Sequence, residues 1–172
     1  MPKTLADQRI RLVALTTKPA DVKAPTVTEL TAGIDLSCSI MKGDYQLGAT
    51  GDQTVSEPTM CEPGAGNDMG ATDYAGQLTV FRMLDDDGKA DITEDVAFQT
   101  LKVKGTELWL VEREGPVYDA DWAADQEVSV YRVSTGSMQK PSDRFGGYIK
   151  RTFPLGVRAA HENVAVVAVV AP

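Results

Sequence analysis

Residues 43–76 read GDYQLGATGDQTVSEPTMCEPGAGNDMGATDYAG, a stretch with seven glycines, six carboxylates and neither Lys nor Arg. Structureless loops longer than about 12–15 residues are uncommon in compact domains and are usually functional or disordered. A segment this polar recovers little free energy by folding onto its own subunit. The composition therefore predicts a long extended loop that becomes ordered only against another molecule.

The rest of the chain favours strands. Segments with alternating polarity or many β-branched and aromatic residues predict seven of them, at residues 8–15, 34–41, 77–84, 107–113, 127–134, 148–153 and 163–170. Within residues 34–41 the polar side chains alternate with apolar ones, which predicts a wet face and a packed face that includes Cys38. Residues 164–170 are apolar on both sides, as in a strand covered on both faces.

One helix is predicted over residues 92–103. Asp91 is the expected N-cap, with Glu94 in the capping-box position, and Gly105 follows the C-terminus. The stripe expected to face the sheet is Val96, Phe98, Leu101 and Ile92. Together these elements predict a mainly β protein, a β-sandwich or partial barrel with one flanking α-helix, forming a single domain over residues 1–172.

Charge is unevenly divided along the chain. The net charge of −8 argues against a nucleic-acid binder, which needs a basic face. Residues 43–76 are purely acidic, whereas residues 140–158 carry five bases and one acid. Separate acidic and basic surfaces allow copies to pair head to tail, and such heterologous contacts give rings or filaments. Simple solubility is the alternative explanation of the same charges.

No segment predicts export or a membrane span. The N-terminal residues lack the apolar run of a signal peptide, and residues 164–170 are far shorter than the roughly 20 residues that cross a bilayer. The two cysteines, Cys38 and Cys61, fit no metal or redox motif and are expected to be reduced thiols. We therefore expect a soluble protein made in a cytoplasm.

Catalytic and metal sites are not predicted. Residues 83–94 resemble an EF-hand loop, but Met83 occupies the first ligand position, so an Asp-rich turn is the preferred interpretation. His161 is the only histidine, and no nucleophile motif or phosphate loop is present. Trp109 is expected in the core and Trp122 on the surface as a contact residue. We expect no enzyme activity and no cofactor; a ligand-binding β-barrel or small hydrolase would need a concave pocket with converging polar groups.

Several stretches resemble one family. Residues 25–38 (PTVTELTAGIDLSC), the glycine-rich loop and residues 77–81 (QLTVF) look like the major tail tube protein of long, non-contractile-tailed bacteriophages, especially those of actinobacterial hosts. Residues 128–133, 148–154 and 164–169 are similar in layout. The resemblance implies a virion tail protein, made and assembled in the host cytoplasm, whose hexameric rings stack into a tube for DNA ejection. No C-terminal immunoglobulin-like domain is expected.

The resemblance also implies partners and sites. The expected partners are other copies of the chain, a tape measure protein in the lumen, a tail terminator and distal tail or baseplate proteins, with DNA passing unbound. Inter-ring contacts are predicted at Asp44, Tyr45, Asp52, Glu57, Glu62, Asp68, Asp73, Tyr74, Lys140, Arg144, Lys150, Arg151 and Arg158. Because a basic lining would bind passing phosphates, the lumen-facing residues are predicted to be Asp35, Ser37, Ser39 and Glu127. Another virion ring component, such as a tail terminator, baseplate or capsid decoration protein, is the alternative.

Overall fold

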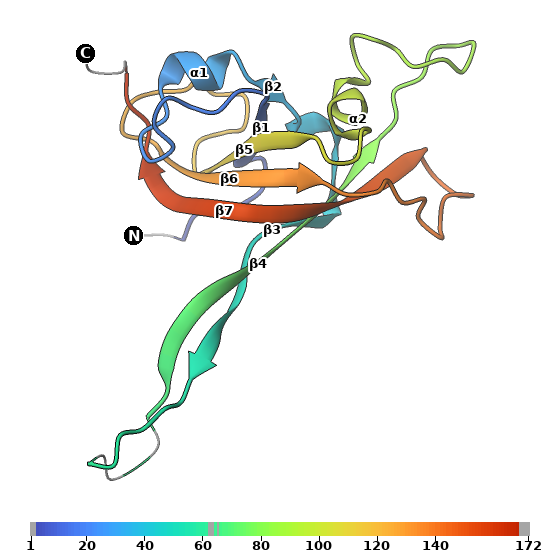
Figure 1. Ribbon diagram of the computed structural model, residues 1–172. Helices are drawn as coiled ribbons and strands as arrows, with labels where there is room; N and C mark the ends of the chain where they lie inside the picture. Colours follow the sequence, from blue (N-terminus) through green and yellow to red (C-terminus); the bar gives the residue numbers. More distant parts are fainter. Residues whose placement is uncertain (1–2, 62–63, 65, 169–172) are drawn as a thin grey trace.

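A computed structural model describes residues 3–61, 64 and 66–168 (Figure 1). The strands are β1 (Ile10–Leu15), β2 (Ile34–Asp35), β3 (Ile40–Val55), β4 (Asp68–Phe81), β5 (Glu107–Glu114), β6 (Glu127–Thr135) and β7 (Lys150–Ala165). The helices are α1 (Val27–Thr31) and α2 (Val96–Leu101), and Ser37–Ser39 form a 3-10 turn. The expected mainly β fold is confirmed.

The strands make one antiparallel sheet in the order β2-β1-β5-β6-β7-β4-β3. The sheet curls until its two edges approach each other. Tyr45 of the edge strand β3 donates a hydrogen bond to Glu112 of β5, which lies near the opposite edge. Residues of β3 and β1 consequently pack into the same hydrophobic cluster. The result is an incomplete barrel, with a seam between β3 and β1.

Each face of the curled sheet has its own hydrophobic core. Adjacent residues in a strand point to opposite faces, so Leu12 joins the inner cluster and Val13 the outer one. The inner cluster includes Leu78, Val80, Leu110, Val133 and Phe153, with Ala97 and Leu101 of α2. The outer cluster includes Trp109, Val111 and Val130, packed with Leu30 of α1 and with Trp122. The expected core position of Trp109 is confirmed, and burial on both faces explains the apolar runs of β1 and β5.

Residues 150–153 and 163–165 of two predicted strands belong to one long strand, β7, which ends at Ala165; residues 169 and 170 of the second prediction lie outside the described residues. The first residues of β7 pair with β4, and from Leu155 onward the strand pairs with β6. Pro154 marks the change of partner: its carbonyl accepts a hydrogen bond of 2.8 Å from the Gly136 N–H, just beyond the end of β6. The nitrogen of Pro154 therefore faces the side on which β6 has already ended. No ladder hydrogen bond is lost there, so a proline is tolerated inside the sheet.

The predicted strand at residues 34–41 is wrong in its middle. β2 ends at Asp35, and the 3-10 turn docks on β1, where Ser37 Oγ accepts a hydrogen bond of 3.0 Å from the Leu12 N–H. The expected alternation is interrupted, and Cys38 is exposed instead of packed. A polar side chain that bonds to a neighbouring backbone competes with the strand ladder here.

The prediction of a structureless loop at residues 43–76 is also wrong. β3 and β4 pair through most of this stretch, from Tyr45 opposite Leu78 to Val55 opposite Asp68, and form a long hairpin that leaves the body (Figure 1). Two β-bulges interrupt the register between Ala49 and Thr54. Glycines and carboxylates have low strand propensity, so the composition concealed the strands.

The helices differ from the prediction in number and length. α2 begins at Val96, because Asp91 caps a preceding turn by accepting hydrogen bonds from the N–H groups of Thr93 (2.9 Å) and Glu94 (3.3 Å). Ile92 is exposed and does not face the sheet. The unpredicted helix α1 starts with a capping box, in which Thr26 and Glu29 each satisfy the other's backbone N–H.

Candidate functional site

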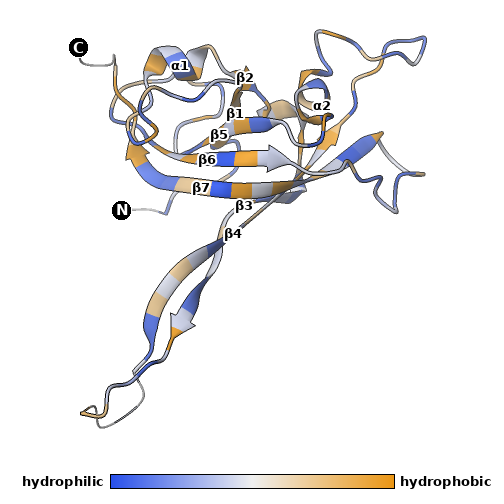
Figure 2. Cartoon of the chain, in the orientation of Figure 1, coloured by the Kyte–Doolittle hydropathy of each residue, from blue (hydrophilic) through white to orange (hydrophobic). Residues whose placement is uncertain are grey.

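The hairpin of β3 and β4 is the outstanding surface feature. All of its described residues from Ala49 to Asp73 are exposed, so this segment buries nothing against the body. Figure 2 shows that hydrophilic and hydrophobic residues are mixed along both strands of the hairpin. Met60 and Met69 are 105% and 73% exposed. An exposed strand pair that presents free apolar side chains is a candidate contact surface.

The projecting part of the hairpin is held by side-chain pairs between its own two strands. Thr72 donates a hydrogen bond of 2.6 Å to Asp52, and Gln53 Nε2 donates one of 3.2 Å to Asp73. Both carboxylates stay exposed, so they remain accessible to another molecule. Glu57 and Asp68 are exposed as well, whereas Glu62 lies outside the described residues.

The hairpin base is fixed to the body by hydrogen bonds. Asp44 accepts from Thr79 and, at 2.8 Å, from Gln77, both on β4. Gly76 lies so close to β7 that an added Cβ would be 2.9 Å from the Leu155 side chain, which explains the glycine. Asp44 is thus already engaged within the subunit, although it was predicted as an inter-ring contact.

Two tyrosines and two glutamates form a partly buried network behind the hairpin base. Tyr45 donates to Glu112, and Tyr131 donates a 2.9 Å hydrogen bond to Glu162. Burial raises the pKa of Tyr45, and the neighbouring Glu112 charge adds to it. Burial and the charges of Glu114 and Glu162 also raise the pKa of Glu112, against the lowering effect of the Tyr45 hydrogen bond. Tyr45 therefore anchors β3 in the subunit, and the half-buried Tyr74 packs on the inner core.

The structure leaves only some of the predicted basic residues exposed. Lys140, Arg144 and Arg158 are exposed. Lys150 is buried and pairs with Asp143, and the half-buried Arg151 donates a 2.7 Å hydrogen bond to the Lys150 carbonyl. The basic surface available to a partner is therefore smaller than the sequence indicated.

The predicted lumen residues do not share one face. Asp35 is opposite Val13, on the outer-core side, where it pairs with Arg11 at 2.9 Å. Glu127 precedes Val128, an outer-core residue, so alternation places Glu127 on the inner-core side. The expectation that these residues form a single wet face is wrong. The 3-10 turn interrupts the strand at Ser37–Ser39, and the alternation of side chains between the two faces of the sheet places Asp35 and Glu127 on opposite sides.

Trp122 is buried, so the prediction of an exposed contact residue is wrong. Two neighbouring guanidinium groups lie over its ring, with the Arg11 and Arg113 Cζ atoms 5.0 and 4.7 Å from the ring centroid. Arg113 is fully buried and donates to the Val117 carbonyl at 2.9 Å and the Ala120 carbonyl at 3.1 Å. The surrounding aspartates indicated an exposed residue, whereas the ring is covered by Arg113 of the preceding strand β5 and by Arg11 of β1, which is distant in the chain.

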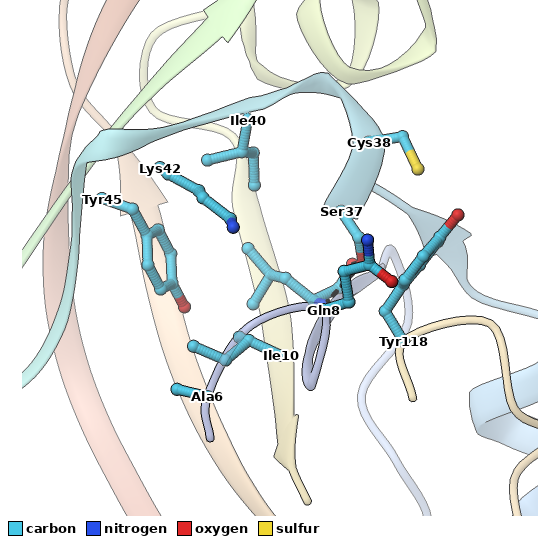
Figure 3. A pocket seen from close by; sticks show the side chains of 10 residues that line it. Ala6, Gln8, Ile10, Ser37, Cys38, Ile40, Lys42, Tyr45 and Tyr118 are labelled. Atoms are coloured by element: carbon cyan, nitrogen blue, oxygen red, sulfur yellow. Dashed lines mark hydrogen bonds between the residues drawn. The ribbon is translucent and has the colours of Figure 1, made fainter. Parts of the chain in front are cut away.

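A pocket of about 370 Å³ lies along the seam between β1 and β3 (Figure 3). Its lining is largely apolar and includes Ile10, Leu12, Ile40 and Tyr45. The Lys42 ammonium at its rim pairs with Asp7. Polar groups of Gln8, Ser37 and Tyr118 also line the pocket.

The Asp-rich turn after β4 uses its carboxylates for backbone hydrogen bonds. Asp85 accepts a 2.7 Å hydrogen bond from the Lys89 N–H, and Gly88 adopts a φ of +76° that favours glycine. No group of three or more His, Cys, Asp or Glu side chains in residues 3–61, 64 and 66–168 could hold a metal. Over the same ranges, no helix is long and apolar enough to cross a bilayer.

A curled antiparallel sheet with a projecting, self-paired hairpin defines a mainly β protein with a long exposed arm. The family model described as phage tail tube protein matches residues 1–170. The chain therefore belongs to the phage tail tube protein family and is a structural component of the bacteriophage tail. A search of curated proteins found no match.

Proposed function

We propose that copies of this chain form hexameric rings that stack into the tail tube and conduct the genome during ejection. The family supports the tail tube role, and the sequence resemblance supports the ring number. One observation carries the stacking: the hairpin projects from the body with every described residue from 49 to 73 exposed. A neighbouring ring supplies the surface that this hairpin otherwise lacks.

The proposed partners follow from a tube. A tape measure protein occupies the lumen before ejection, and terminator and distal tail or baseplate proteins close the two ends. The long, non-contractile tail and the host remain predictions. The protein is proposed to act without catalysis, because its polar clusters serve turns, caps and core hydrogen bonds.

Concentrated purified protein tests the assembly. Negative-stain electron microscopy and sedimentation should show extended hollow tubes for a tube protein, whereas a terminator, baseplate or decoration protein would stop at single rings or monomers. Monomers at all concentrations and ionic strengths would contradict the proposed function.

The lumen lining is tested with two single substitutions. Asp35 and Glu127 lie on opposite faces of the sheet, so only one of them can face passing DNA. Asp35→Lys and Glu127→Lys phages should both assemble tails, and only one should eject DNA more slowly, because a basic lining retains phosphates. Unchanged ejection in both would contradict a lumen at either face.

A further inference from the structure

We infer that the β6–β7 loop, residues 136–149, is the surface that receives the hairpin of the next copy. This inference rests on the proposed function and identifies the partner surface of the hairpin. It concerns two described segments, the outer hairpin (residues 55–60 and 68–69) and the β6–β7 loop.

The two segments lie at opposite ends of one strand. β4 runs for 14 residues from Asp68 at the outer hairpin to Phe81, a length of about 45 Å at roughly 3.4 Å per residue. Phe81 is paired with Lys150, the residue that follows the β6–β7 loop. Figure 1 shows the hairpin and this loop pointing away from the body in different directions. A contact between such separated surfaces is heterologous and propagates along a line of copies.

The β6–β7 loop presents exposed aromatic groups. Phe145 is 88% exposed and Tyr148 is 81% exposed. The Arg144 Cζ lies 4.9 Å from the Phe145 ring centroid, and Tyr148 packs edge-on against Phe81 with 5.9 Å between ring centroids. Aromatic and arginine side chains are the residues that most often dominate binding energy. Methionine contacts aromatic rings favourably, so the free side chains of Met60 and Met69 match this surface.

The charges of the two segments are complementary. Residues 43–76 contain no base, and Glu57 and Asp68 are exposed on the outer hairpin. On the β6–β7 loop, Lys140 and Arg144 are exposed and form no ion pair with any described carboxylate. By contrast, the base at the seam pocket, Lys42, is already paired with Asp7.

The β6–β7 loop has a preformed shape. Gln139 and Thr152 exchange backbone hydrogen bonds of 2.8 and 3.0 Å, which fold the loop back along β7. Lys150 holds Asp143, the only carboxylate of the loop, through an ion pair. Little ordering is needed when a partner binds, and less free energy is lost than for a mobile loop.

Three variants test the inference. The receiver variant carries Arg144→Glu and Phe145→Ser, two exposed positions outside the core. Its matched control carries Lys89→Glu and Ile92→Ser, which likewise reverse one positive charge and replace one large apolar side chain by serine, at exposed positions on the loop before α2. The hairpin variant replaces residues 52–72 by Asn-Gly, which joins the register partners Gly51 and Asp73. Thermal unfolding first establishes that each variant folds.

The receiver and hairpin variants should each lose tube formation, with at least a tenfold drop in mean particle length, whereas the control should polymerise like the unaltered protein. When the two defective variants are mixed in equal amounts, the intact hairpin of the receiver variant should bind the intact β6–β7 loop of the hairpin variant. The mixture should then give a larger species that stops growing. Normal tubes from the receiver variant, or no joined species in the mixture, would overturn the inference while the proposed function stands. Absence of tubes from the unaltered protein would overturn both.

Discussion

Shortening the hairpin separates assembly from folding. The replacement of residues 52–72 by Asn-Gly leaves the base of the hairpin paired and closes it with a two-residue turn of the type favoured in hairpins. The inner core and the Tyr45 anchor lie outside the removed segment. We expect a subunit that folds normally and does not stack.

The expected change in stability is small. Every described residue in the removed segment is exposed, so almost no apolar burial is lost. Each halving of a loop returns only about 0.6 kcal/mol of closure entropy. The free energy of unfolding should therefore stay within about 1 kcal/mol of the original, since the two small effects are of this size.

Urea unfolding of the dispersed subunit measures the stability, and sedimentation with electron microscopy measures the assembly. The combination of unchanged unfolding and absent tubes identifies the hairpin as an assembly element. Tubes of normal length would refute the stacking role. A loss of several kcal/mol would instead show that the hairpin supports the fold.

Three further predictions concern charge. Asp95→Asn should destabilise the fold by about 2–4 kcal/mol, measured by urea unfolding, because Asp95 is buried and accepts hydrogen bonds from Arg82, the Met83 N–H and Gln99 at 3.0–3.1 Å. Burial opposes ionisation of Asp95, but these hydrogen bonds and the Arg82 charge lower its pKa below 3.8. The stability that the Asp95 carboxylate contributes is therefore present above pH 3.8 and is lost as the pH falls through the folded-state pKa. The pKa of Glu112 is raised above 4.5, so the protonated form of this group favours folding below pH 4.5, and that effect is lost as the pH rises through the folded-state pKa. Glu112→Gln should therefore raise the Tm at pH 7 more than at pH 4. Equal changes in Tm at the two pH values would contradict this. Raising salt from about 0.1 to 1 M shortens the Debye length from about 10 to 3 Å, so tubes should shorten if exposed charge pairs hold the rings, and unchanged lengths would contradict charge-driven stacking.

Part of the molecule was readable from local patterns. The strands β1, β5 and β6 coincide closely with their predicted ranges, because their apolar runs are buried on one or both faces. Trp109 alternates with Val111 and lies in the core as expected. The capping box of Thr26 and Glu29 is a local pattern too, because its two residues are only three positions apart. The unusual composition of residues 43–76 correctly marked the extended segment.

The amino-acid sequence by itself determined a mainly β chain with an acidic projecting arm, since strand periodicity and charge are properties of neighbouring residues. Only the tertiary structure decided that the arm is a paired hairpin, that Trp122 is buried and that Asp35 and Glu127 face opposite sides. Strand pairing, the docking of the 3-10 turn at Ser37–Ser39 on β1 and the contact of Arg11 with Trp122 depend on residues far apart in the chain. Such contacts set burial and facing direction, and no local pattern encodes them.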